Sequence, residues 1–174
     1  MIGTPNQPGI CPICGSSEHL GDKLKELYDR SVCKKCHSGF MNRRIGAFII
    51  DLNIWIWVLL PLFGVIGQFD EISGGTLNNL DLLTYLIFVF KDGFKGQSPG
   101  KKLMGVQVVD KTTGQPIGFL ASFKRNLPLL IPLAVFFIWA ELREGKRLGD
   151  GWANTRVIWE KYRDKAPFVL VPVD

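Results

Sequence analysis

The sequence lacks several motifs that mark common catalytic sites. It has no His-Glu-x-x-His pair, and the glycine-rich stretch 93–102 lacks the Gly-x-x-x-x-Gly-Lys-Ser/Thr spacing of a phosphate-binding loop. We interpret that stretch as a basic turn at a membrane interface, and we expect the protein not to be an enzyme. The first ten residues are polar and rich in Pro and Gly, without a charged and then apolar leader. We therefore expect no signal peptide and a cytoplasmic N-terminus.

The composition favours a membrane protein. Apolar residues make up 47% of the 174 residues and include five Trp and twelve Phe, which is unusual for a small soluble protein. The net charge is +5, but Lys and Arg lie mainly beside the apolar runs. This placement is typical of cytoplasmic membrane flanks and of contact with anionic lipid. We expect a protein of the cell membrane that has the lipid bilayer as its partner and binds no nucleic acid.

Residues 43–67 form the first apolar run, which is long enough to cross the hydrocarbon core of a bilayer as a helix. Asp51 lies inside this run, and an unpaired charge at that depth would cost a few kcal/mol. Arg44 precedes it by two helical turns on the same face, so its side chain can reach toward Asp51. The alternative is a tolerated polar residue that faces a neighbouring helix.

Two further apolar runs predict the rest of the topology. Residues 68–81 contain no Lys or Arg and are expected outside, and residues 80–90 then predict a second spanning helix that returns to a basic cytoplasmic loop. The third run, 127–142, contains two prolines and has basic residues on both sides. This pattern favours a broken or re-entrant segment over a full crossing, which stays open as the alternative.

All four cysteines lie near the N-terminus, in two C-x-x-C pairs: Cys11, Cys14, Cys33 and Cys36. Two such pairs at this separation predict a closed, structural Zn²⁺ site with four thiolate ligands, in which no position is left for a catalytic water. Two disulfides and a covalent haem at the C-x-x-C-H segment are the alternatives. We expect His19 and His37 to lie at the surface or to contact the cysteine ligands without binding the metal themselves.

Hydrophobic spacing predicts four short elements outside the membrane. We expect two helical turns within 22–30, a β-hairpin within 103–118, a helix over 119–127 that lies in the membrane interface, and a strand over 155–159 that can pair with the hairpin. In the interfacial helix, Phe119 and Leu120 are expected to face the lipid, and Lys124 and Arg125 to face water.

Four blocks of the sequence resemble the RDD family of small membrane proteins, named for one arginine and two aspartates. They are RRIGAFIID (43–51), GQSPGKKLMGVQVVD (96–110), RNLPLLIPL (125–133) and LGDGWANTRVI (148–158). The resemblance assigns the family's three charged residues to Arg44, Asp51 and Asp150, and it implies a helical membrane core with a suspected role in transport. One departure is Asn154, where many members have glycine.

The predicted protein is therefore an α-helical integral membrane protein with two spanning helices, a broken or re-entrant third apolar segment, a small extramembrane β-hairpin and an N-terminal zinc-binding module. Its expected parts are a zinc-ribbon-like module (1–42), a transmembrane domain (43–160) and a tail (161–174). Two functions fit: transport of protons, cations or a small ligand through a charged cluster of Arg44, Asp51 and Asp150, or a membrane-anchored adaptor whose zinc module docks a cytoplasmic protein. Assembly into a homo-oligomer stays open.

Overall fold

The computed structural model describes residues 10–16, 24–28, 30–72, 86–87, 89–130 and 148–169. Its elements, in chain order, are β1 (Lys25–Leu27), β2 (Arg30–Val32), α1 (Lys34–Ile54), the π-helical turn η2 (Trp55–Leu59), α2 (Leu60–Ile72), α4 (Pro99–Met104), β3 (Val106–Asp110), α5 (Phe119–Asn126), η3 (Leu127–Leu130), α7 (Leu148–Trp152), β4 (Thr155–Trp159) and η4 (Glu160–Tyr162). Most of the predicted second spanning helix and most of the third apolar run lie outside the described residues.

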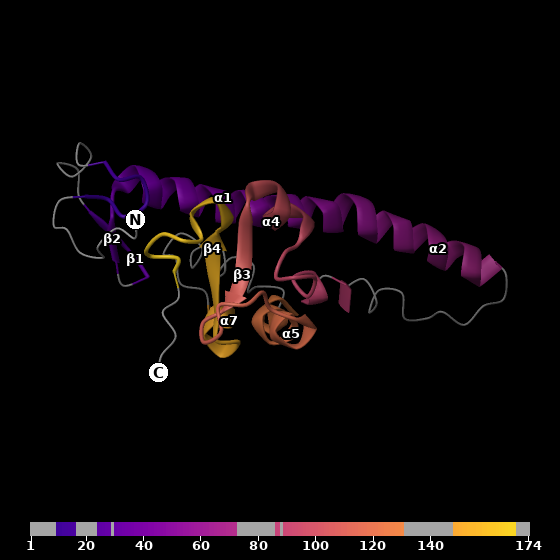
Figure 1. The fold of residues 1–174 in the computed structure, drawn as a ribbon. Coiled ribbons are helices and arrows are strands. Elements are labelled where there is room, and N and C mark those ends of the chain that lie inside the picture. The colour runs from indigo at the N-terminus through magenta and orange to yellow at the C-terminus, as the bar shows by residue number, and fades with distance from the viewer. Residues whose placement is uncertain are drawn as a thin grey trace.

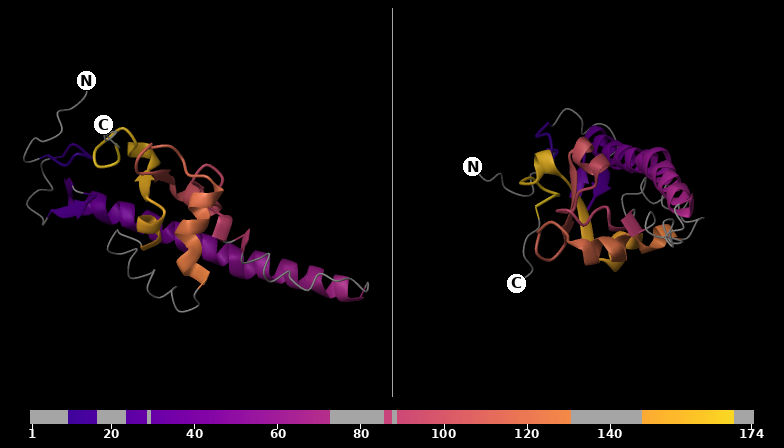
Figure 2. Two further views of the ribbon diagram at one scale, coloured as in Figure 1. Left: turned by 90° about the horizontal axis from the view of Figure 1, so that it is seen from below. Right: turned by 90° about the vertical axis from the view of Figure 1, so that its right-hand side faces the viewer.

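One long helix organises the structure (Figure 1). It runs without a break through α1, η2 and α2, and α2 extends beyond the sheet and α5 (Figure 2). Residues 34–66 include the apolar window that could cross a membrane, with a mean hydropathy of 2.1 and only 6% of that window buried. In the described part of the chain this is the single helix long and apolar enough to do so. It begins at Lys34, earlier than the predicted start at residue 43.

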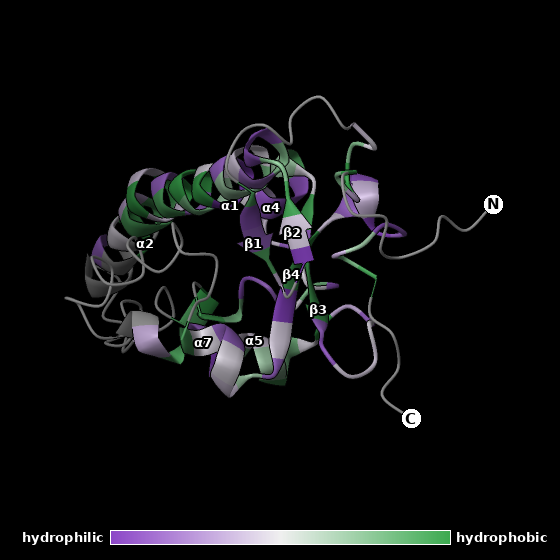
Figure 3. Ribbon diagram, turned by 90° about the vertical axis from the view of Figure 1, so that its left-hand side faces the viewer, coloured by the Kyte–Doolittle hydropathy of each residue, from purple (hydrophilic) through white to green (hydrophobic). Residues whose placement is uncertain are grey.

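A π-helical turn lies within this continuous helix, just before Pro61. Proline has no N–H to donate, and its ring crowds the carbonyl group four residues earlier, which here belongs to Trp57. The backbone N–H of Leu60 accordingly donates to the carbonyl oxygen of Trp55, five residues back. Exposed apolar side chains such as Trp57, Val58 and Leu62 surround this turn. The same apolar character colours α2 in Figure 3.

A two-stranded antiparallel sheet of β3 and β4 packs beside α1, with Val108 opposite Val157. The predicted strand over 155–159 and its pairing are therefore confirmed. The predicted hairpin within 103–118 is reduced, because its second arm contributes a single bridge between Val109 and Pro116. Proline cannot donate to a ladder, which explains why the regular partner of β3 comes from the distant β4 instead.

The prediction of a helix between the cysteine pairs is wrong. Residues 25–32 form a small antiparallel hairpin in which Leu27 pairs with Arg30. Leu27 and Val32 are buried, and Tyr28 adopts a φ of 50° at the turn, which no helix allows. The Tyr28 hydroxyl donates to the Val157 carbonyl oxygen at 2.9 Å. Tertiary contacts with β4 thus decide the local structure over helical propensity.

The predicted helix over 119–127 is present as α5 with Phe119 and Leu120 on an exposed face as expected, but Arg125 is buried instead of facing water. Leu120 is 69% exposed and Phe119 is 48% exposed, whereas Arg125 and Asn126 are buried. The Asn126 amide donates to the Val89 carbonyl oxygen at 2.9 Å, and the Ser122 hydroxyl donates to the same carbonyl at 3.1 Å. Ser122, Arg125 and Asn126 of α5 therefore face the protein interior, whereas Lys124 is exposed.

Candidate functional site: a buried charged network

A continuous chain of buried polar contacts runs between the long helix and the elements packed beside it. We call it the charged network; its members are Arg44, Asp51, Lys91, Asp92, Ser98, Lys101, Arg125 and Asp150. Burying so many charges is costly unless each is paired and hydrogen-bonded. The elements that carry the network are α1, α4, α5, α7 and the turn that follows residue 90.

One end of the network lies at Asp150. Arg44 of α1 contacts this carboxylate with 3.3 Å between Nη2 and Oδ2, and Nε of Arg125 donates to the other oxygen. The adjacent Gly149 lets α7 approach α5, because a Cβ atom there would stand 2.0 Å from the carbonyl oxygen of Arg125. A glycine before Asp150 is therefore what brings the two helices close enough for the ion pair.

Asp92 is the centre of the network and is fully buried. Arg125 reaches its Oδ2 atom at 2.9 Å, and the ammonium group of Lys101 contacts its Oδ1 atom. Burial by itself would raise the pKa of Asp92, but the neighbouring charges of Lys101 and Arg125 hold the pKa well below its usual range. The backbone N–H of Asp92 donates to Ser122, which fixes the position of the carboxylate. Asp92 is therefore ionised at neutral pH.

Lys101 connects Asp92 to the other half of the network. Its ammonium group lies 3.4 Å from the hydroxyl oxygen of Ser98. Burial is the main cause that lowers the pKa of Lys101 to about 8; the adjacent charge of Arg125 acts in the same direction, and Asp92 opposes both. For Arg125, by contrast, burial is outweighed by Asp150 and Asp92, which raise its pKa.

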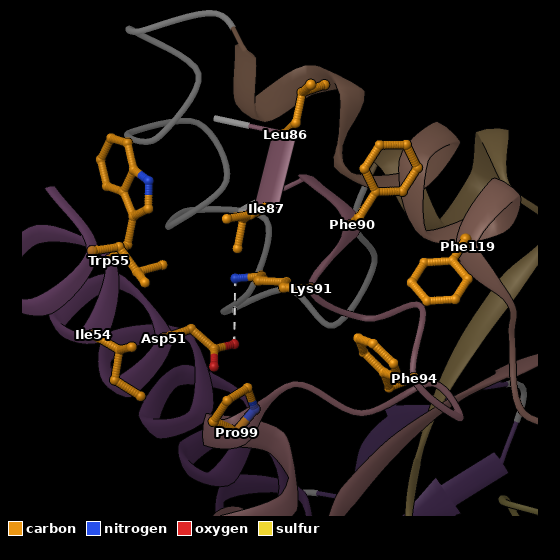
Figure 4. Close-up of a pocket in the computed structure, with 11 residues that line it drawn as sticks. Asp51, Ile54, Trp55, Leu86, Ile87, Phe90, Lys91, Phe94, Pro99 and Phe119 are labelled. Atoms are coloured by element: carbon orange, nitrogen blue, oxygen red, sulfur yellow. Dashed lines mark ion pairs between the residues drawn. The ribbon is translucent and has the colours of Figure 1, made fainter. Parts of the chain in front are cut away.

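The other end of the network lies at Asp51 of α1. Its Oδ2 atom accepts from the Ser98 hydroxyl at 2.5 Å and lies 3.3 Å from the ammonium group of Lys91, and its Oδ1 atom accepts from the backbone N–H of Gly100 at 2.8 Å. Figure 4 shows Lys91 and Asp51 facing each other. A Cβ atom on Gly100 would stand 2.3 Å from the carbonyl oxygen of Ala47, so glycine is what lets α4 contact α1.

The two ends connect the three residues that the sequence predicted, but not in the expected way. Arg44 contacts Asp150, while Asp51 contacts Lys91, Ser98 and Gly100. The link between the two groups passes through Arg125, Asp92, Lys101 and Ser98. Sequence reasoning missed these linking residues because they lie in loops or on a helix face that was taken to be outward. The signal that could have found them is the polar run of Lys91 and Asp92 directly after an apolar segment.

Residues 96–100 spell Gly-Gln-Ser-Pro-Gly, which fits the Gly-x-Ser-x-Gly pattern of a hydrolase nucleophile. The surroundings differ from those of an exposed nucleophile, since Ser98 is buried and its hydroxyl donates a hydrogen bond to Asp51. Ser98 also accepts from the backbone N–H of Lys101 and so begins α4. These contacts indicate that Ser98 has a structural role in the network.

The four cysteines of the N-terminal module come together. Their sulfur atoms all lie within 4.8 Å of one another, and none is in a disulfide. A tetrahedral metal with sulfur ligands at about 2.3 Å would separate those sulfurs by roughly 3.8 Å, and the sulfurs of Cys14 and Cys33 are 3.9 Å apart. The backbone N–H of Cys36 donates to the sulfur of Cys33, a contact that favours a thiolate. Cys11, Cys14, Cys33 and Cys36 thus fit a metal ion.

A long apolar helix beside buried ion pairs is typical of membrane proteins. The chain belongs to the RDD family, whose model matches residues 38–154, more than half of its length. It is thus an RDD family membrane protein with a cluster of four cysteines close to its N-terminus.

Curated relatives match a shorter stretch. Over 58 residues the chain is 40% identical to the proline-rich antigen homolog of Mycobacterium tuberculosis, in strain CDC 1551 / Oshkosh and in strain ATCC 25618 / H37Rv. The match covers 32% of this chain and 24% of those proteins, so the chain spans about a quarter of the length of these relatives. No solved structure matches the chain.

Proposed function

We propose that the protein moves protons, cations or a small ligand across the cell membrane through the charged network. The observation that carries this proposal is the position of Asp51 and Lys91, which end the network at the wall of a cavity of about 680 Å³. A buried acidic side chain at the wall of a cavity is the kind of group that membrane proteins use along ion and proton pathways. The protein then acts as a carrier and not as an enzyme.

The test is an ion-flux measurement with the whole chain in sealed vesicles. Neutralising the cavity end with Asp51→Asn should abolish proton or cation flux while the protein still inserts and folds. The matched control is Asp164→Asn, which neutralises an exposed aspartate outside the network and should leave flux unchanged. Equal flux in the wild type and in a well-folded Asp51→Asn variant would refute the transport proposal.

The proposed topology has two spanning helices and a third segment that breaks or re-enters, with the N-terminus, residues 91–125 and the C-terminal tail in the cytoplasm. The basic residues of those segments support it, because Lys and Arg favour the cytoplasmic side. Labelling of single cysteines from outside the cell tests this arrangement. A label that reaches a cysteine placed at Lys165 from outside would mean that the third segment crosses fully.

An adaptor role is the second candidate. Its support is the exposure of two apolar side chains on the N-terminal module, Ile10 at 45% and Leu24 at 48%, which a cytoplasmic protein could cover. A Zn²⁺ ion held by the four cysteines would then fix the docking surface. Replacing both residues as Ile10→Ser and Leu24→Ser should release such a partner in cells without changing flux. Unchanged partner retention would remove the support for this role.

A further inference from the structure

The N-terminal module shares one hydrophobic core with β3, β4 and the C-terminal segment. The buried side chains that it contributes include two of the four cysteines and one residue from each hairpin strand: Cys11, Ile13, Leu27, Val32 and Cys33. They belong to the same cluster as Val108, Val157 and Phe168. Because such a core is closely packed, a change in the conformation of the module would disturb the sheet beside it.

Two hydrogen bonds join the module to β4 and to the segment that follows β4. The Tyr28 hydroxyl, at the turn of the β1–β2 hairpin, donates to the Val157 carbonyl oxygen at 2.9 Å. The ammonium group of Lys165 donates to the carbonyl oxygen of Ile13 at 3.1 Å, and Ile13 lies inside the first C-x-x-C pair. Small metal modules often fold only when their metal is bound. We therefore expect both bonds to depend on a metal ion held by the four cysteines.

Four aromatic rings continue this contact toward the charged network. We call them the aromatic cluster; they belong to Tyr28, Phe40, Trp159 and Phe168. The ring centroids of Tyr28 and Phe40 are 6.2 Å apart, and those of Phe40 and Phe168 are 5.0 Å apart. The guanidinium carbon of Arg44 lies 5.8 Å from the centroid of the Phe40 ring, and Arg44 contacts Asp150. The aromatic cluster therefore lies between the module and the Asp150 end of the network.

The cysteines also begin the helix that carries Arg44. Cys33 is the N-cap of α1, and its sulfur accepts from the backbone N–H of Cys36 at 3.5 Å. Asp150, the partner of Arg44, lies in α7, and a short turn joins α7 to β4, the strand that the β1–β2 hairpin contacts (Figure 1). Both partners of this ion pair thus lie on elements whose position depends on the module.

We propose that metal binding by the four cysteines regulates the charged network, because it docks the module against the aromatic cluster and so holds Arg44 in its pair with Asp150. Loss of the metal ion releases the β1–β2 hairpin from β4 and loosens α7. Linkage makes the effect reciprocal, so the contacts of the docked module also tighten metal binding. The inference rests on the proposed function in taking the network as the functional site, but its test measures conformation and metal affinity and not flux.

Hydrogen–deuterium exchange of the full chain in detergent micelles tests the effect of the metal on the network. The zinc-loaded protein is compared with the same protein after a chelator has removed the zinc. Exchange of the backbone amides of residues 148–152 should accelerate about tenfold, a typical size for coupling between two sites. Residues 60–72 of α2 are the control, because α2 lies at the opposite end of the long helix from the module (Figure 1), and their exchange should stay the same. Unchanged exchange in 148–152, or an equal acceleration in α2, would overturn the proposal.

Zinc affinity, measured by competition with a chelator of known affinity, tests the reverse direction. Tyr28→Phe keeps the ring but removes the hydroxyl that donates to Val157, so the affinity should fall about fivefold, as the loss of one net hydrogen bond predicts. Tyr162→Phe is the matched control and should leave the affinity unchanged, since within the described residues the Tyr162 hydroxyl makes no hydrogen bond. Equal affinity in the wild type and Tyr28→Phe, or an equal loss in Tyr162→Phe, would contradict the proposed coupling.

The failure of this inference can be told apart from the failure of transport. Accelerated exchange in residues 148–152 and weaker zinc binding in Tyr28→Phe, together with undiminished flux in Asp51→Asn, would sustain the regulation by metal and refute transport. Abolished flux in Asp51→Asn, together with exchange and zinc affinity that do not change, would sustain transport and refute the regulation.

Discussion

Arg44 and Asp150, separated by 106 residues along the chain, form an ion pair with 3.3 Å between Nη2 and Oδ2. The pair ties α1 to α7, and Arg125 of α5 contacts the second oxygen of the same carboxylate. Three helices from distant parts of the sequence therefore share one buried charge. A contact of this kind holds the elements in register, and its loss would leave a charged group without compensation.

Replacing the central carboxylate tests how strongly the network supports the fold. Asp92→Asn leaves Arg125 and Lys101 buried with one negative charge fewer, and we expect the free energy of unfolding in detergent micelles to fall by about 3–5 kcal/mol. The control Asp164→Asn, at an exposed position, should change it by less than about 0.5 kcal/mol. A loss of similar size in both variants would mean that Asp92 has no special role.

The close contact between α4 and α1 gives a second prediction. Gly100→Ala would place a Cβ atom 2.3 Å from the Ala47 carbonyl oxygen and 2.8 Å from Oδ1 of Asp51, so α4 must shift. We expect a destabilisation of about 1–3 kcal/mol, measured by chemical unfolding. Gly151→Ala is the matched control, since nothing lies within 4 Å of the added methyl group. Destabilisation confined to Gly151→Ala would contradict the packing described.

The ionised state of Asp92 predicts how stability depends on pH. Its pKa in the folded protein is lowered by Lys101 and Arg125 relative to the unfolded value of about 4. A carboxylate with a lowered folded-state pKa contributes stability that is complete above the unfolded pKa and is lost as the pH falls toward the folded value. The difference in unfolding free energy between the wild type and Asp92→Asn should therefore narrow below about pH 4. A difference that stays constant down to pH 3 would show that Asp92 has an ordinary pKa.

The cysteine cluster predicts one metal ion per chain. Purified protein should contain stoichiometric zinc, and Cys33→Ser should lose it, because this buried residue contributes one of four sulfur ligands. His37→Ala is the control and should retain the metal, since its ring is not among those ligands. Elemental analysis of the three proteins checks the prediction. Absence of zinc from the wild type, or its loss in His37→Ala, would exclude a site made of four thiolates.

The features that could be predicted from the sequence are those carried by local pattern. The apolar run from residue 43 predicts the long helix apart from its earlier start at Lys34, and the alternation over 155–159 predicts β4. The cysteine spacing predicts the cluster of four cysteines, Cys11, Cys14, Cys33 and Cys36. The departure at Asn154, where many RDD proteins have glycine, is explained by a φ of 50°, which asparagine tolerates.

The features that sequence reasoning missed depend on contacts between distant segments. The peptide around Tyr28 has helical spacing, yet it forms a hairpin because the Tyr28 hydroxyl and the side chain of Leu27 contact the core. Burial of Arg125 in α5 was missed because an amphipathic pattern does not show which polar side chains have partners inside the protein. Only the carboxylates of Asp92 and Asp150, from other elements, make burial of Arg125 favourable.

We expect Asp51 and Asp150, which lie at opposite ends of the network, to act as one unit through the linking residues Arg125, Asp92, Lys101 and Ser98. A double-mutant cycle tests it most directly, using the unfolding free energies of Asp51→Asn, Asp150→Asn and the double variant. The account predicts an interaction energy of at least about 0.5 kcal/mol, while Asp51→Asn combined with the control Asp164→Asn should be additive. Additivity of Asp51→Asn and Asp150→Asn within about 0.3 kcal/mol would contradict the account.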